Sequence, residues 1–520
     1  MTPETLISEV TIEGNLKQFL LVLAVSLSVA TLPQIFNWLS KIPYTLLLVI
    51  VGLGLAFLDV RLAVLSPELI LLIFLPPLLF EAAWNLEWSK LKQDLVPIAL
   101  YAVFGVVISV AGTAFALHQI AGISLAIALL VGASLSATDP VSVIALFREL
   151  GVEKRLAVLV EGESLFNDGI AVVAFSFLVG FSLGNEEVGI PILIARFLAF
   201  VGIGIGVGSF IGFGISYLTQ RFDLPLVEQS LTLVAAYGTY IIVEELGGSG
   251  VIGVVTVGLI FGNFGSRIGM QPSTRLAVTQ FWEFLAFFVN SIVFLLIGDA
   301  MSLADLEANL GTIGITVMAM FVTRAIAIFG LGWLSNWLVK SEISLPDRTV
   351  IWWGGLRGSV SIALALSVPD VLADRTQIIA LVFGAVLFTL LVQGLTAKTL
   401  LEILGLLKNQ ELRQQYQEAI AQRVALNRVI DYLSEVSGDR KIEPEFSDRL
   451  VSQIQEKLDL LQAEIDRMHD RSAELRELTT DKLEGELRAI EADTYAEFAR
   501  SGELKELPAS VLQELFNKLN

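Results

Sequence analysis

Long apolar runs follow one another through most of the chain. They recur from Leu16 to about Leu404, and at roughly 20 residues each run is long enough, as a helix, to cross the ~30 Å hydrocarbon layer of a bilayer. Reading the runs between their charged breaks predicts thirteen membrane-spanning helices. The predicted spans are 16–39, 43–58, 66–86, 95–118, 123–147, 155–184, 190–218, 224–246, 250–265, 277–301, 310–339, 347–367 and 377–404.

The composition agrees with a membrane protein and changes abruptly near the end of the chain. Of the 520 residues, 54% are hydrophobic and 17% are charged, and the mean hydropathy is +0.72, a balance that a water-soluble core of this length would not need. Residues 408–520, in contrast, contain 16 Lys and Arg and 24 Asp and Glu. We therefore expect an all-α protein with a transmembrane domain over 1–407 and a soluble, cytoplasmic helical tail over 408–520.

The tail carries one amphipathic stripe, in which apolar residues recur every three or four positions at Leu458, Leu461, Ile465 and Met468. A stripe this short is more typical of ordinary helix packing than of a coiled coil. Regulation, dimer contact and an inert appendage all stay open as roles for the tail.

Lys and Arg between the predicted spans gather on one side of the membrane. With the N-terminus outside, the inner loops carry Lys41, Lys90, Lys92, Arg148, Lys154, Arg155, Arg221, Arg267, Arg275, Lys340 and Arg348, and the outer side carries Lys17, Arg61, Arg196 and Arg375. Because cytoplasmic loops are enriched in these residues, the bias supports thirteen spans and a cytoplasmic tail. We separately expect the membrane to be the plasma (inner) membrane of a bacterium. The first residues are acidic, unlike a cleavable signal peptide, so we expect the first span to be retained.

Several classes of function are excluded by residue type. The chain has no cysteine and only two histidines, so disulfides, thiolate metal sites and histidine metal centres are not expected. A net charge of −19 without clustered Lys and Arg argues against nucleic acid as a partner. The sequence has no HExxH motif, no nucleophile paired with a base and no phosphate-binding loop, so we expect neither an enzyme nor a bound cofactor.

An odd number of spans has a topological consequence. If the seventh is a linker, spans one to six and eight to thirteen enter the membrane from opposite sides and form inverted repeats, whose substrate site lies where two broken helices meet. The fifth span of each half contains helix-breaking residues. These spans read GASLSATDPVSVIAL, with Pro140, and WWGGLRGSVSIAL, with three glycines around Arg357.

Charged residues inside the spans are the main functional candidates, because each costs on the order of 3 kcal/mol at the bilayer centre. They are Asp139, Glu163, Asp168, Arg324 and Arg357, with Glu81 nearer to a span end.

The sixth span, VEGESLFNDGIAVVAF, is the richest in polar groups. On a helix Ser164 and Asp168 share one face, and Glu163 and Asn167 share the adjacent strip. With a backbone carbonyl freed near Thr138, these oxygens suit a hard monovalent cation such as Na⁺.

Each candidate also has a structural interpretation. Ser164 and Asn167 are residues that commonly join helices in lipid, and Asp139 before Pro140 is a common helix start. Glu81 near a helix end can reach interfacial water. We favour a charge-compensating role for the two arginines, since arginines in a cation site would repel the substrate.

Four ordered segments, FLPPLLFEA, SATDPVSV, EGESLFNDGIAVV and WGGLRGSVSIALAL, resemble the sodium/proton exchangers of the monovalent cation:proton antiporter-1 family over about residues 15–405. The resemblance implies a thirteen-helix inverted-repeat fold, a homodimer, and an Asn167-Asp168 pair in which Asp168 binds cation or proton. It also implies that Ser164, Glu81 and the Thr138 backbone complete a Na⁺ site. By the same resemblance Glu163 pairs with Arg324 and Asp139 with Arg357, although the alternative pairing stays open.

The expected function is therefore Na⁺/H⁺ (or Li⁺/H⁺) antiport, in which the two cations compete for Asp168. Asn167 stands where a second aspartate could stand, so we expect one cation to exchange for one proton without net current. A potassium/proton antiporter of the same fold stays open, because oxygen ligands alone do not fix ion size. A cation channel is a further alternative, which paired broken helices in one chain argue against.

Overall fold

The structure is a computed structural model that describes residues 3–36, 42–58, 62, 66–183, 190–219, 224–266, 270, 272–372, 374–407, 410–438 and 444–471. All regular structure within these ranges is helical, as expected for an all-α protein. By length and composition alone, seven of the described helices could cross a bilayer, and five shorter apolar helices accompany them. The chain is therefore an integral membrane protein with several crossings.

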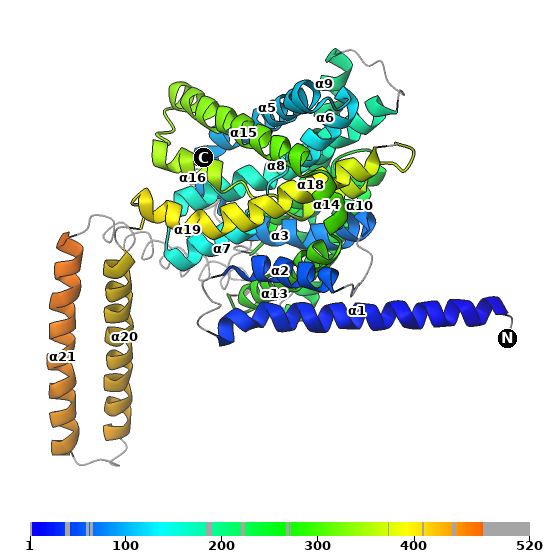
Figure 1. The fold of residues 1–520 in the computed structure, drawn as a ribbon. Coiled ribbons are helices and arrows are strands. Elements are labelled where there is room, and N and C mark those ends of the chain that lie inside the picture. Colours follow the sequence, from blue (N-terminus) through cyan, green and yellow to red (C-terminus); the bar gives the residue numbers. More distant parts are fainter. Residues whose placement is uncertain are drawn as a thin grey trace. The chain divides into compact units, whose positions relative to one another are not determined.

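Residues 3–404 of the described chain belong to one compact unit, in which two groups of helices can be distinguished by their packing. The first helix group is built around α13 and α11. Figure 1 shows α1, α2 and α13 running side by side. It comprises α1 (Pro3–Ile35), α2 (Tyr44–Phe57), the π-helical turn η1 (Leu69–Phe74) with α3 (Leu75–Asn85), α9 (Ile190–Thr219), α10 (Pro225–Glu245), α11 (Gly250–Ile260) with η3 (Phe261–Gly265), and α13 (Pro272–Asp299).

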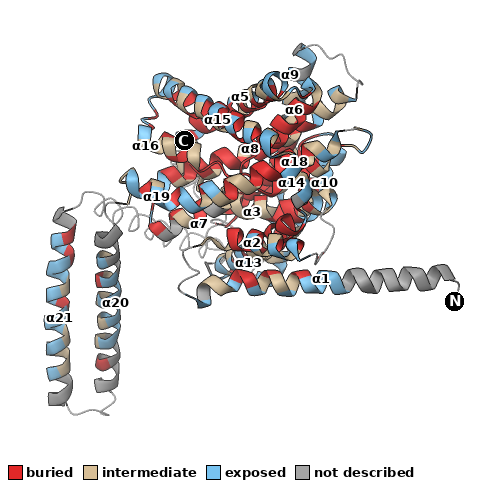
Figure 2. Cartoon of the chain, viewed as in Figure 1, coloured by how far each residue is buried: buried red, intermediate tan, exposed pale blue. Residues whose placement is uncertain are grey.

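The second helix group is built around α5, which packs on α6, α8 and α15. It comprises α4 (Trp88–Leu91) with η2 (Lys92–Asp94) and α5 (Leu95–Ala121), α6 (Leu125–Ser134), α7 (Val141–Leu150), α8 (Lys154–Ser182), α14 (Leu303–Ala308), α15 (Leu310–Val339), α16 (Leu345–Trp353), α17 (Ser359–Leu366), and α18 (Arg375–Phe388) with η4 (Thr389–Gln393) and α19 (Gly394–Ile403). Figure 2 shows buried residues concentrated along α8, α6 and α18, in the interior of the unit. The two groups meet where α3 and α11 contact α8 and where α13 contacts α17.

Close packing in the first helix group depends on glycine. A side chain at Gly52 of α2 would overlap the Leu295 carbonyl of α13, and one at Gly298 would overlap the Val49 carbonyl. The two backbones therefore touch directly, because small residues let membrane helices approach closely.

The helices break at both places that the sequence predicts. Between α6 and α7 the chain is non-helical over residues 135–140, and between α16 and α17 it is non-helical over residues 354–358. Non-helical backbone at membrane depth needs partners within the protein, since lipid offers none. Both breaks lie in the second helix group and bring free backbone groups into its interior.

Each of the thirteen predicted spans falls on helix in the described residues, although the number of membrane crossings and the inverted repeat stay predictions. One boundary differs clearly. The first helix begins at Pro3 rather than near residue 16 and includes the polar N-terminal segment. Polarity marks where an apolar stretch ends, whereas a helix can continue into water as long as its backbone bonds are made.

A second compact unit contains α20 (Gln410–Gly438) and α21 (Pro444–Arg471), which pack side by side. Leu458, Ile465 and Met468 of the predicted apolar stripe are buried, so the stripe forms the packing face of α21. This packing against α20 agrees with an ordinary helix-packing face rather than a coiled coil.

Candidate functional site

The two helix breaks are joined to each other by hydrogen bonds. The Asp139 N–H donates to the Leu356 carbonyl over 2.8 Å. The Arg357 Nη1 donates to the carbonyls of Ser136 and Ala137, over 3.2 Å and 3.0 Å. Backbone groups freed by one break are thus satisfied by residues of the other, which holds the two segments in one position.

Glu163 and Arg324 form a buried ion pair, as the sequence analysis expected. Arg324 Nη1 and Nη2 each lie 3.2 Å from a Glu163 carboxylate oxygen, a two-bond geometry that fits guanidinium to carboxylate. Arg324 also donates to the carbonyls of Ile351 and Trp352, at the end of α16. The pair therefore connects α8 and α15 with the break between α16 and α17.

The second expected pair, between Asp139 and Arg357, is wrong for this structure. Arg357 is 0% exposed and forms no salt bridge with a described residue; its Nε lies 3.3 Å from the Met320 sulfur. The Asp139 carboxylate instead accepts from the Val141 N–H over 2.9 Å, an Asx-type turn at the start of α7. The Arg357 guanidinium instead donates to the backbone carbonyls of the first break.

Asn167 organises the polar strip of α8. Its amide nitrogen donates to Glu163 Oε1 over 3.1 Å and to Thr138 Oγ1 over 3.0 Å. The Thr138 hydroxyl in turn lies 2.9 Å from the Ser164 hydroxyl. These residues are buried, so α8 and the break before α7 are joined by a continuous hydrogen-bonded network.

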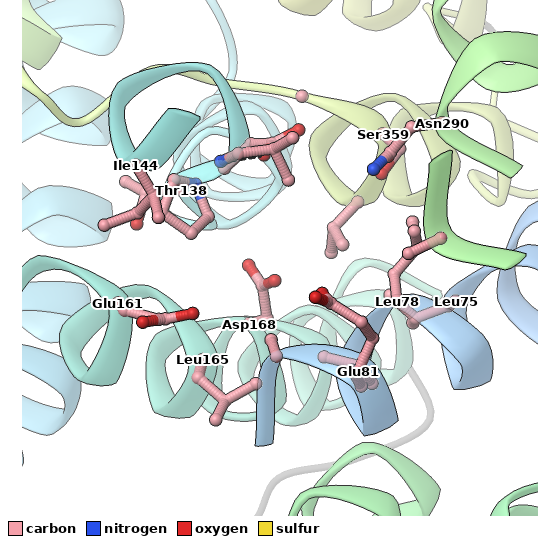
Figure 3. A pocket seen from close by; sticks show the side chains of 18 of the residues that line it. Leu75, Leu78, Glu81, Thr138, Ile144, Glu161, Leu165, Asp168, Asn290 and Ser359 are labelled. Carbon is pink, nitrogen blue, oxygen red and sulfur yellow. Dashed lines mark hydrogen bonds between the residues drawn. The ribbon is translucent and has the colours of Figure 1, made fainter. Parts of the chain in front are cut away.

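A cavity of about 410 Å³ lies between the two helix groups. Figure 3 shows Asp168 from α8 and Glu81 from α3 directing their carboxylates into the same space, with Thr138 beside them. Asp168 is 8% exposed, and its Oδ1 has no hydrogen-bond partner among the described residues. A carboxylate oxygen in such a position is available to a ligand from the cavity.

Four of the six predicted cation-site residues line this cavity. They are Glu81, Thr138, Asp139 and Asp168. Ser164 and Asn167 are not among the lining residues; they lie behind Thr138, in the network described above.

Sequence reasoning missed several polar residues of the lining. They are Tyr44, Glu161, Glu283, Asn290 and Ser359. Glu283 lies on α13 with Phe287 and Asn290. The spacing of these three residues, i, i+4 and i+7, places them on one face of the helix, so the sequence could have indicated that they line the same cavity.

The lining has a strongly one-sided charge. The described residues of the lining include five carboxylates, from Glu81, Asp139, Glu161, Asp168 and Glu283, and neither Lys nor Arg. Carboxylates facing a common space attract cations and repel anions. Carboxylate, hydroxyl and amide oxygens are also the ligands that hard cations prefer.

A cavity with cation-binding chemistry inside a membrane protein of several crossings defines the class of ion transporters. The chain belongs to the family of transmembrane sodium/hydrogen exchangers, whose family model matches residues 23–403. This is a family of transporters rather than enzymes, and its ions are substrates rather than resident cofactors.

Sequence similarity to other proteins extends over the whole chain. The Na(+)/H(+) antiporter ApNhaP of Aphanothece halophytica is 60% identical over 519 residues, which cover 100% of each chain. The low-affinity Na(+)/H(+) antiporter NhaS1 of Synechocystis is 54% identical over 515 residues, with 97% of this chain and 96% of the relative covered. The resemblance therefore includes the tail as well as the membrane helices.

A solved structure supports the fold. The sodium proton antiporter MjNhaP1 of Methanocaldococcus jannaschii superposes with a TM-score of 0.63 at 20% identity, covering 76% of this chain and 99% of that chain.

Proposed function

We propose that this protein exchanges Na⁺ for H⁺ across a membrane, and that the two cations compete for the carboxylate of Asp168. The proposal rests on the carboxylate-lined cavity, in which Asp168 Oδ1 has no hydrogen-bond partner among the described residues, and on full-length relatives named as Na⁺/H⁺ antiporters. A bare carboxylate is costly to move through a dry barrier, whereas a carboxylate neutralised by H⁺ or Na⁺ is not. Only the neutralised site then changes its exposure from one side to the other, which couples the two fluxes.

The Na⁺ ligands in this proposal are Asp168, Glu81, Thr138 and Ser164. Asp168 and Glu81 supply charge from two different helices, and Thr138 brings oxygen from the break before α7. The Ser164 hydroxyl lies 2.9 Å from the Thr138 hydroxyl and is the fourth proposed ligand. Asp139 contributes negative charge to the lining, while Asn167 positions Thr138 rather than binding the ion.

The arginines hold the site without entering it. Arg324 neutralises Glu163, and Arg357 donates to the carbonyls of the first break. Neither arginine lines the cavity. Their positive charge therefore stabilises the broken helices without occupying the place of the cation.

The setting of the protein follows from the same resemblance and from the charge bias of the loops. We propose thirteen spans in two inverted repeats, with the N-terminus outside, in the inner membrane of a bacterium, and a homodimer that serves pH homeostasis. Residues 1–407 form the transport domain and 408–520 a cytoplasmic tail. Deleting the tail and comparing pH profiles tests whether it regulates transport.

The deciding experiment uses everted membrane vesicles from a host that lacks its own Na⁺/H⁺ antiporters. A pH-sensitive dye reports proton movement when Na⁺, Li⁺ or K⁺ is added in turn at several pH values. Competition predicts a response to Na⁺ whose apparent KM rises as the pH falls. A response to K⁺ alone would assign K⁺/H⁺ exchange instead, and Na⁺ flux without proton movement would contradict antiport altogether.

A further inference from the structure

Asn290 is an amide in the middle of an apolar stretch of α13, which reads FLAFFVNSIVFLLIG around it. It is only 4% exposed. A polar side chain inside a membrane helix is costly and marks a functional position by default. The cation site proposed above consists of residues from α3, α8 and the break before α7. It does not use Asn290, which lines the same cavity from α13.

The surroundings of Asn290 belong to the same cavity. Glu283, Phe287 and Asn290 form the face of α13 that lines it, together with Tyr44 of α2. Figure 3 shows the Asn290 amide turned from α13 into the space that Asp168 and Glu81 enter from the other side. The amide thus faces the carboxylates across the cavity.

The wall that carries Asn290 is held firmly. The rings of Tyr44 and Phe287 pack with centroids 5.4 Å apart, and Tyr44 lines the cavity together with Asn290. The backbones of α2 and α13 touch at Gly52 and Gly298. The amide of Asn290 carries a carbonyl acceptor as well as N–H donors, and the carbonyl oxygen is the group that can bind a cation.

We infer that Asn290 is a specificity-determining residue of the transport reaction, supplying a neutral oxygen to the alkali cation from the wall opposite Asp168. This inference rests on the proposed exchange of Na⁺ for H⁺. A neutral carbonyl replaces part of the hydration shell without adding a charge that would hold the ion. Small cations lose the most hydration on binding, so they depend on this oxygen more than K⁺ does.

The test compares Asn290→Ala with two other variants in everted vesicles, with Na⁺, Li⁺ and K⁺ as the probes. Asn290→Ala is expected to raise the apparent KM for Na⁺ and Li⁺ about three- to tenfold, the usual effect of losing one good polar contact, with the maximal rate kept. The KM for any K⁺ response rises less. Asn290→Asp adds charge, so it lowers the KM for Na⁺ and also slows turnover.

Ser291→Ala is the matched control. Ser291 is buried on the same helix, and within the described chain its hydroxyl donates to the Phe287 carbonyl; it is not among the residues that line the cavity. It is expected to keep the wild-type KM for every cation. An equal loss of rate in both variants, with unchanged KM values, would assign Asn290 a purely structural role and overturn the inference.

A second readout separates this inference from the proposed function. Ligands that bind the folded state stabilise it, so Na⁺ and Li⁺ should raise the Tm of purified wild-type protein more than that of Asn290→Ala. If wild-type vesicles show no cation-dependent proton movement, the proposed antiport is refuted. The thermal shifts still test whether Asn290 contributes to cation binding. Equal Na⁺ shifts in wild type and Asn290→Ala would refute the role of Asn290 even when antiport is confirmed.

Discussion

At the scale of single residues, Asp168 is the carboxylate on which exchange depends. Replacing it with asparagine keeps the shape and removes the exchangeable charge, so Asp168→Asn is expected to reduce Na⁺-dependent proton movement to the background of empty vesicles. The variant should still be made and purified, because Oδ1 of Asp168 has no partner to lose among the described residues. Vesicle assays and size-exclusion profiles measure the two outcomes. Retained exchange would remove Asp168 from its proposed role.

The buried pair of Glu163 and Arg324 gives a prediction about stability. Arg324→Gln leaves a buried carboxylate without its counter-charge and is expected to cost about 3–5 kcal/mol, whereas the double variant Glu163→Gln/Arg324→Gln should recover a large part of this loss. Thermal unfolding in detergent measures the difference.

The control for this prediction is an exposed pair. Asp370 bonds to Arg375 with its side chain 91% exposed, so Asp370→Asn should change stability by about 0.5 kcal/mol or less. If the double variant is no more stable than Arg324→Gln, the loss of the ion pair is not the reason why Arg324→Gln lowers the stability.

The sequence could identify the charged residues of the site but not all of their partners. Asp168, Glu163 and Arg324 stand out because charge inside a span is rare. The contacts of Arg357 could not be predicted, since carbonyl acceptors of a broken helix carry no signal in the side-chain sequence. Tyr44 and Asn290 were missed for a related reason: neutral polar residues are common in spans, and periodicity does not say which cavity a helix face meets.

At the scale of elements, the breaks were predictable and their contact was not. Pro140 directly precedes the start of α7 and Gly354 directly follows the end of α16, so the structure confirms a break at each predicted place. That the two breaks touch depends on the packing of the second helix group, which involves residues more than 200 positions apart.

This contact leads to a prediction for Gly358. A Cβ there would lie 2.6 Å from the Cβ of Asp139, too close for any real contact, so Gly358→Ala must push the two breaks apart. We expect the variant to lose most of its Na⁺-dependent proton movement and to unfold at a lower temperature, as measured in vesicles and in detergent.

Gly311→Ala provides the comparison, because a Cβ at Gly311 on α15 meets nothing within 4 Å. It should keep full activity and be at least as stable as wild type, since alanine favours helix over glycine by about 1 kcal/mol. Wild-type exchange by Gly358→Ala would show that the breaks can separate freely.

At the scale of the whole molecule, the proposed stoichiometry predicts transport without current. A cycle that moved one net charge would gain about 2.3 kcal/mol per 100 mV of membrane potential. With one Na⁺ exchanged for one H⁺, the rate in proteoliposomes should stay the same when the potential is clamped at different values. A rate that follows the potential, with a matching current, would contradict this.

The direct backbone contact between α2 and α13 has a practical consequence for following the transport cycle. Helices locked at Gly52 and Gly298 cannot slide past each other without losing that fit, so this pair can serve as the fixed reference frame of the molecule. Spin labels on the exposed ends of α2 and α13 should keep one constant separation, whatever cation is present. Any change in distance from these labels to α8 would then report the movement of the carboxylate-bearing helix alone.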